Sequence, residues 1–179
     1  MSDFVTALVD RLGAVATPER AEAEKRYLKS DLEFLGATVW QIRSAVRDVD
    51  VGESFDHAGL VALVDELWSE PVHERRMAAV FVLDRYARML TVDDLPLLER
   101  LVRDSRTWAL VDGLAGDVIG RLVEADASGV SPRLDRWSTD GDFWVRRASL
   151  LAELRRIRHG APLDRFLARA EGMLEEKEF

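Results

Sequence analysis

The sequence predicts an all-α protein. Apolar residues recur at intervals of three and four through every long segment, the spacing that places them on one face of a helix. No stretch shows the sustained alternation of apolar and polar residues, bounded by hairpin turns, that is typical of strands. Start and stop signals for helices also recur at short intervals. We therefore expect a series of helices with short connections.

These signals set the predicted bounds of each helix in turn. A capping residue, in two cases followed by a proline at the first helical position, precedes five helices: Thr17-Pro18, Thr38, Ser54, Thr91 and Ser131-Pro132. Glycines mark four ends: Gly36, Gly52, Gly129 and Gly160. The predicted helices cover residues 3–15, 18–34, 39–49, 55–69, 71–89, 92–104, 107–126, 132–139, 142–158 and 162–177.

A weak internal repeat groups these helices into hairpins. The nine residues that begin with Arg75-Arg76 align with the nine that begin with Arg146-Arg147, and both stretches end in leucine. Asp112 lies 36 residues after Arg76 and 35 before Arg147. Repeats of this length are typical of helical solenoids, in which each hairpin buries its apolar face against its neighbours. Arg76, Asp112 and Arg147 are then expected to line one concave groove, on the second helices of three successive hairpins: 71–89, 107–126 and 142–158.

Composition excludes several classes of protein. The 179 residues, 47% of them hydrophobic, are enough for one domain with a continuous core. The chain has no cysteine and three scattered histidines, so we expect no disulfide, no metal site and no other cofactor. No segment approaches the roughly 18 apolar residues of a membrane span, and no signal peptide is recognisable at the N-terminus. We expect a monomeric, cytoplasmic protein without membrane contacts.

The charge distribution bears on nucleic-acid binding. A formal net charge of -8 argues against it, because phosphate binding depends on a positive surface. Residues 143–169, however, contain seven arginines and only two acidic residues, Glu153 and Asp164. Two interpretations remain open: a local basic face that binds phosphates, and an ordinary solvated helix face.

Two tryptophans, a carboxylate and an arginine form the candidate site. Trp108 and Asp112 are four residues apart in a predicted helix, which places an indole and a carboxylate on one face. Trp144 precedes Arg147 by one turn in another predicted helix. A ring beside a carboxylate attracts a developing positive charge, and Arg147 is suited to hold a phosphate nearby. This chemistry fits cleavage at a sugar carbon. The alternatives are a core role for Trp108 and an arginine partner in the next repeat for Asp112.

The same residues lie among motifs that extend over nearly the whole chain. In order they are Tyr27-Leu28-Lys29-Ser30, Phe34-Leu35-Gly36, Leu67-Trp68 followed by Glu74 and Ala78-Ala79, Trp108 to Asp112, Phe143 to Arg147, and Glu176-Lys177-Glu178-Phe179. In these motifs the chain resembles the AlkD-like DNA alkylation repair family, HEAT-like helical-repeat glycosylases that excise alkylated bases. The resemblance implies a right-handed solenoid of HEAT-like antiparallel helical hairpins with a concave groove.

The resemblance also implies a function. The chain would be a DNA glycosylase of base excision repair that hydrolyses the N-glycosidic bond of cationic N3- or N7-alkylated purines in duplex DNA, without a tight base-flipping pocket. By the resemblance, Trp108, Asp112 and Arg147 form the catalytic surface. Asp112 would stabilise the cationic sugar and orient water, Trp108 would pack on the deoxyribose, and Arg147 would bind a phosphate.

Six further residues are candidate DNA contacts: Tyr27, Lys29, Arg43, Arg76, Trp144 and Arg146. For Tyr27, Arg43 and Trp144, a packing role is the alternative. We assign the remaining tryptophans to packing: Trp40, Trp68 and Trp137. The expected partner is double-stranded DNA carrying alkylated bases. The alternative function is a non-catalytic helical-repeat module that binds unusual DNA or protein.

One feature departs from the family pattern. The family places a further catalytic tryptophan in a helix beyond its Lys-Glu-Phe segment, whereas the last tryptophan of this chain is Trp144. The chain is then either a fragment or a shortened member with an incomplete aromatic clamp. We expect residues 1–179 to form a single HEAT-like domain that lacks its C-terminal repeats, because Phe179 follows a charged run as though a new helix were beginning.

Overall fold

The computed structural model describes residues 3–52 and 54–177. These residues form helices and connecting turns, with one isolated bridge between Glu33 and Val72, so the predicted all-α fold is confirmed. The chain divides into two compact parts, Met1–Met89 and Leu90–Phe179, called here the N-terminal unit and the C-terminal unit. Glu178 and Phe179, which belong to the last motif of the family resemblance, lie outside the described residues.

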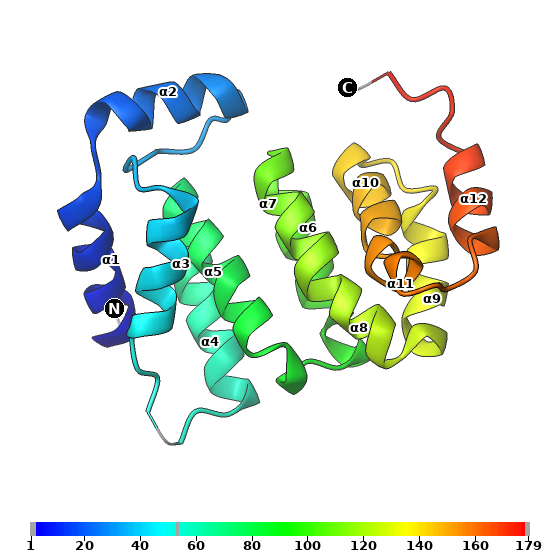
Figure 1. The fold of residues 1–179 in the computed structure, drawn as a ribbon, viewed down its shortest axis with the longest axis horizontal. Helices are drawn as coiled ribbons and strands as arrows, with labels where there is room; N and C mark the ends of the chain where they lie inside the picture. The colour runs from blue at the N-terminus through cyan, green and yellow to red at the C-terminus, as the bar shows by residue number, and fades with distance from the viewer. Residues whose placement is uncertain (1–2, 53, 178–179) are drawn as a thin grey trace. The chain divides into compact units, whose positions relative to one another are not determined.

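Four helices of the N-terminal unit, α1, α3, α4 and α5, pack against one another. Helix α3 contacts α1 on one side and α5 on the other, and α4 pairs with α5 as a hairpin (Figure 1). The core contains fully buried Leu8, Ile42, Leu60 and Leu83. The elements are α1 (Asp3–Val15), α2 (Pro18–Leu28), α3 (Val39–Asp48), α4 (His57–Trp68), α5 (His73–Arg85) and the 3-10 turn η1 (Ala87–Met89).

Helix α10 is the central element of the C-terminal unit. It contacts α6, α7, α9 and α12, and the core around it includes fully buried Leu98, Leu110, Leu114 and Trp137. The elements are η2 (Val92–Asp94), α6 (Leu95–Ser105), α7 (Trp108–Asp112), the π-helical segment η3 (Gly113–Ile119), α8 (Gly120–Ala125), α9 (Ala127–Trp137), α10 (Phe143–Leu151), α11 (Leu154–Arg158) and α12 (Asp164–Glu171).

Three predicted helix bounds were wrong. Helix α12 ends at Glu171 rather than at residue 177, because Gly172, a poor helix former, follows it. Helix α2 ends at Leu28 rather than at residue 34, because Lys29 adopts a left-handed conformation with φ of 48°. Helix α9 begins at Ala127 rather than at residue 132, because the Asp126 carboxylate accepts a hydrogen bond from the N–H of Gly129. That carboxylate caps the first turn, so Gly129 lies inside the helix instead of ending one.

The three predicted second helices of hairpins correspond to α5, to the continuous run α7–η3–α8, and to α10 with α11. A solenoid that extends over both units, and a single domain over residues 1–179, stay predictions. In residues 3–52 and 54–177, no helix is both long and apolar enough to cross a membrane.

Candidate functional site

The candidate site centres on an ion pair between α7 and α10. The Nε of Arg147 donates to Oδ1 of Asp112 at 2.7 Å, and its Nη2 donates to Oδ2 at 2.9 Å. Such a bidentate pair fixes the orientation of the carboxylate as well as its position. The Asp112 side chain remains 36% exposed and that of Arg147 22% exposed, so a ligand can approach the pair from solvent. Two of the three predicted catalytic residues are therefore in direct contact.

Trp108 opens the short helix α7, one turn before Asp112. The i, i+4 spacing places its indole and the carboxylate on the same face of the helix. Leu110 and Val111 point the other way and are fully buried in the unit's core, whereas Trp108 is half-buried. The helix thus anchors itself through two aliphatic residues and presents the indole and the carboxylate outward.

The backbone changes from α-helical to π-helical directly after Asp112. The π-helical segment η3 covers Gly113–Ile119 and continues into α8. π-Helical turns are rare and occur frequently at functional sites. Sequence reasoning missed this feature and predicted one uniform helix over 107–126. The available signal was the presence of Gly113, Gly116 and Gly120 within that helical pattern.

The first turn of α10 carries two further predicted site residues. Asp142 caps the helix by accepting from the Trp144 N–H at 2.8 Å. The half-buried indole of Trp144 lies with its centroid 5.0 Å from that of Phe143. Arg146 donates to the Asp140 carbonyl at 2.8 Å and pairs with Glu176. Arg146 therefore already has partners within the C-terminal unit.

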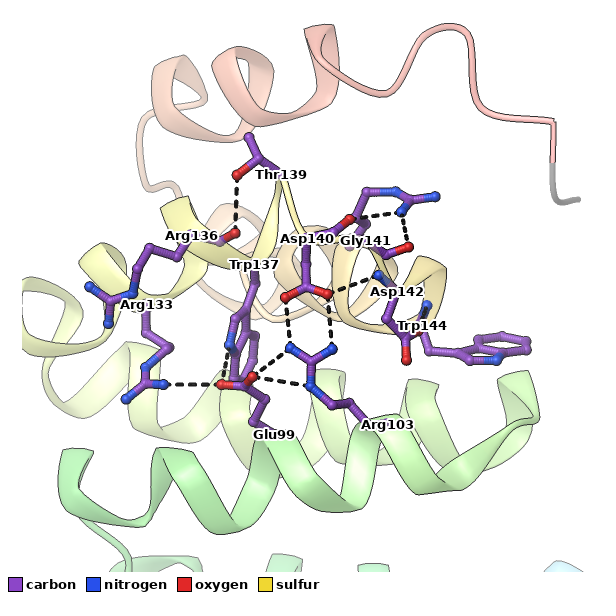
Figure 2. A network of polar contacts seen from close by, with 11 residues as sticks. Glu99, Arg103, Arg133, Arg136, Trp137, Thr139, Asp140, Gly141, Asp142 and Trp144 are labelled. Atoms are coloured by element: carbon purple, nitrogen blue, oxygen red, sulfur yellow. Dashed lines mark hydrogen bonds and ion pairs between the residues drawn. The ribbon is translucent and has the colours of Figure 1, made fainter.

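A polar network that sequence reasoning did not predict links α6, α9 and the turn before α10 (Figure 2). Glu99 on α6 accepts from Arg103 at 2.6 Å, from Arg133 at 3.0 Å and from the Trp137 indole at 2.8 Å. Arg103 also binds Asp140 with two hydrogen bonds, at 2.9 and 2.6 Å. The only sequence signal was the i, i+4 spacing of Glu99 and Arg103, because the other partners lie 34 to 38 residues away.

These contacts shift the ionisation of both carboxyl groups in the network. Hydrogen bonds from Arg103 hold the pKa of Asp140 below its ordinary value. Burial by itself would raise the pKa of Glu99, but the hydrogen bonds from Arg103 and Trp137 outweigh it and lower that pKa. Both groups are therefore carboxylates at neutral pH. Across the described residues, no three His, Asp or Glu side chains are grouped so that they could hold a metal ion.

The remaining predicted DNA contacts belong to the N-terminal unit. Tyr27 is 70% exposed, and Lys29 is exposed where α2 ends. Arg43 is exposed, with its guanidinium 4.3 Å above the ring of Phe81. Arg76, in contrast, is only 8% exposed, which leaves little of it for a phosphate to touch.

The packing role predicted for three tryptophans is confirmed for two of them. Trp68 is 3% exposed and Trp137 is 2% exposed. The prediction was wrong for Trp40, which is 71% exposed. Helix α3 buries the face that carries Ile42 and Val46, and this register turns Trp40 toward solvent.

Comparison with known protein families identifies a related family. A family model described as DNA alkylation repair enzyme matches residues 8–179 of the chain. The matched range contains every predicted site residue, from Tyr27 to Arg147. No curated protein matches the sequence.

Proposed function

The chain belongs to the DNA alkylation repair enzyme family, and from this premise we propose that it is a monomeric DNA glycosylase. Its substrate would be duplex DNA that carries cationic N3- or N7-alkylated purines. The observation that carries the proposal is the solvent-accessible Asp112–Arg147 pair, with Trp108 on the same face of α7. No cofactor is part of the proposed chemistry.

The proposed reaction breaks the bond between the sugar C1′ and the purine nitrogen. An alkylated purine carries a positive charge, so it departs as a neutral base with the bonding electrons and needs no proton from the protein. Positive charge then develops on the sugar, where a preorganised carboxylate stabilises it. Asp112 has this role, and it also orients the water that adds to C1′ and loses its proton to solvent.

Arg147 and Trp108 have supporting roles. The two hydrogen bonds from Arg147 hold the carboxylate of Asp112 in one orientation before substrate arrives. The positive charge of Arg147 attracts a phosphate beside the lesion. The indole of Trp108 offers a flat, electron-rich face to the cationic sugar. Since the exposed pair is reached from the surface, the reaction does not require a flipped base in a deep pocket.

The test is base release from methylated duplex DNA by this 179-residue chain. We expect the released alkylpurine and an abasic site to appear in equal amounts, and neither to appear with unmethylated DNA of the same sequence. Formation of abasic sites is read by alkaline strand cleavage. Binding of methylated DNA without any base release would overturn the glycosylase proposal.

A second candidate function is a non-catalytic module that binds unusual DNA or protein. It is favoured by the same ion pair, because Asp112 bound on both oxygens also fits a purely structural carboxylate. The variant Arg147→Ala helps to separate DNA binding from protein binding. If Arg147 contacts a phosphate, the variant should bind DNA more weakly, with a salt-dependence slope smaller by about one. An unchanged slope would assign Arg147 to structure alone.

A further inference from the structure

The network around Arg103 connects to the candidate site through the main chain. Arg103 lies on α6, which is joined to α7 by only Arg106 and Thr107. Its partner Asp140 lies in the turn that leads into α10. The helix pair that carries Asp112 is therefore bonded to the start of the helix that carries Arg147.

The turn before α10 is itself held by several hydrogen bonds. The Asp140 carboxylate accepts two bonds from Arg103 and one, at 2.8 Å, from the N–H of Asp142. Asp142 in turn caps α10. The side chain of Arg146 donates to the carbonyls of Asp140 and Gly141 at 2.8 and 3.0 Å. A displacement of Asp140 would therefore move the first turn of α10, which lies one turn away from Arg147.

We infer that Arg103 is a positioning residue: through Asp140 it sets the axial position of α10, and so holds Arg147 in register with Asp112. The inference rests on the function proposed for that pair. The hydrogen bonds of Arg103 go to Glu99 and Asp140, so its effect on Arg147 passes through Asp140. The axial position of α10 matters for the Asp112–Arg147 pair, because both hydrogen bonds of a bidentate ion pair require correct orientation of the guanidinium.

A stabilising role alone would have a different signature. The Arg103 side chain is 38% exposed and that of Asp140 22% exposed, and ion pairs with this exposure contribute little to stability. A displacement of about 1 Å in a catalytic group can nevertheless lower a rate by about 100-fold. Arg103 should therefore affect the rate of base release much more than the midpoint of unfolding.

The chain offers a matched control in Arg133. Both Arg103 and Arg133 donate to Glu99, but only Arg103 continues to Asp140 (Figure 2). Arg103→Gln and Arg133→Gln each remove one guanidinium from the network, and Asp140→Ala removes the link to α10 from the other side. A difference between the two arginine variants isolates the contact with Asp140.

The experiment measures single-turnover base release with saturating protein, together with DNA affinity. We expect Arg103→Gln and Asp140→Ala to lower the rate by about 10-fold or more and to change Kd by less than about 3-fold. Arg133→Gln should remain within about 2-fold of the wild type on both measures. Arg103→Lys keeps the positive charge but loses the planar guanidinium that makes two hydrogen bonds to Asp140, so it should recover only part of the rate. Equal rates for Arg103→Gln and Arg133→Gln would overturn the inference.

Hydrogen exchange gives a second measurement that does not depend on activity. The Nε–H of Arg147 and the amide of Trp144 should exchange faster in Arg103→Gln than in Arg133→Gln, because the first change loosens the start of α10. Equal exchange in the two variants would also overturn the inference. If the wild type releases no base, the proposed function fails, and exchange still reports whether Arg103 holds the pair.

Discussion

The two units each contain a carboxylate that binds a segment more than 30 residues away, and the two carboxylates differ in what they bind. In the N-terminal unit, Glu74 accepts from the backbone N–H groups of Leu35, Gly36 and Ala37. In the C-terminal unit, Asp112 accepts from the guanidinium of Arg147. The Glu74 residue is 0% exposed, whereas the Asp112 side chain is 36% exposed.

This difference distinguishes a structural carboxylate from a candidate catalytic one. A buried charge is tolerated when hydrogen bonds satisfy it, and Glu74 receives three, at 3.0, 2.7 and 3.2 Å. The donors are loop N–H groups, which fit a role in fixing the connection between α2 and α3. Asp112 lies where solvent and a ligand reach it, and its partner carries a charge of its own. Orientation by a charged group at an accessible surface is what a site requires.

The largest expected effect on stability comes from Gly36→Ala, at the loop that Glu74 holds. Gly36 has a φ of +94°, and a Cβ there would lie 2.1 Å from the carbonyl oxygen of Thr17. Both the strained backbone and the clash with main chain oppose the substitution. We expect the free energy of unfolding to fall by about 3 kcal/mol or more, measured by urea denaturation. An unchanged midpoint would show that the loop is not held as described.

A smaller effect is expected from acidification at His73, the neighbour of Glu74. Burial lowers the pKa of His73 below its ordinary value of 6.5, although the charge of Glu74 opposes this. The unfolded chain therefore binds a proton at a higher pH than the folded one does. Stability that is present above pH 6.5 is lost as the pH falls from there toward the pKa of the folded state. Between these two pKa values the free energy of unfolding falls by about 1.4 kcal/mol for each pH unit.

The control is His73→Phe. This variant keeps an aromatic ring where His73 stacks on Phe34, with 4.8 Å between the two ring centroids. Urea denaturation at about pH 7 and at about pH 5.5 should show a smaller loss of stability in the variant than in the wild type. Identical losses in both proteins would assign the pH dependence to other groups.

The smallest effect is expected from Gly116→Ala, in the π-helical segment after Asp112. A Cβ at Gly116 would meet nothing within 4 Å. Alanine is favoured over glycine in helices by about 1 kcal/mol, so the midpoint of thermal unfolding should stay the same or rise slightly. Together with Gly36→Ala, this variant shows whether the close packing at Gly36, and not the loss of a glycine as such, causes destabilisation. A marked fall in the midpoint would mean that η3 requires glycine.

Local patterns predicted the features that depend on local spacing. Helical periodicity predicted the all-α fold, and the i, i+4 spacing placed Trp108 and Asp112 on one face of α7. The repeat of 35 residues indicated that Asp112 and Arg147 occupy equivalent positions, and the two side chains are indeed in contact. The sequence also allowed a structural alternative for Asp112, namely pairing with an arginine in the next repeat. The contact with Arg147 is such a pairing.

Features that depend on distant partners could not be predicted in this way. The helix predicted to continue to residue 34 ends at Leu28, and the N–H groups of residues 35–37 bind Glu74, which lies 37 to 39 residues further along the chain. The exposure of Trp40 follows from the register in which α3 packs, which the residue type alone does not set. The bond between Arg103 and Asp140 spans 37 residues and matched no motif.

The most direct test of the two roles compares an acid-to-amide change at each carboxylate, with stability and base release both measured. Glu74→Gln should lower the free energy of unfolding by about 2 kcal/mol, because an amide cannot replace the buried charge, and its folded fraction should release base at the wild-type rate. Asp112→Asn should change stability by less than about 1 kcal/mol and lower the single-turnover rate at least about 100-fold, with DNA binding retained. Wild-type base release by Asp112→Asn would contradict the catalytic role of Asp112.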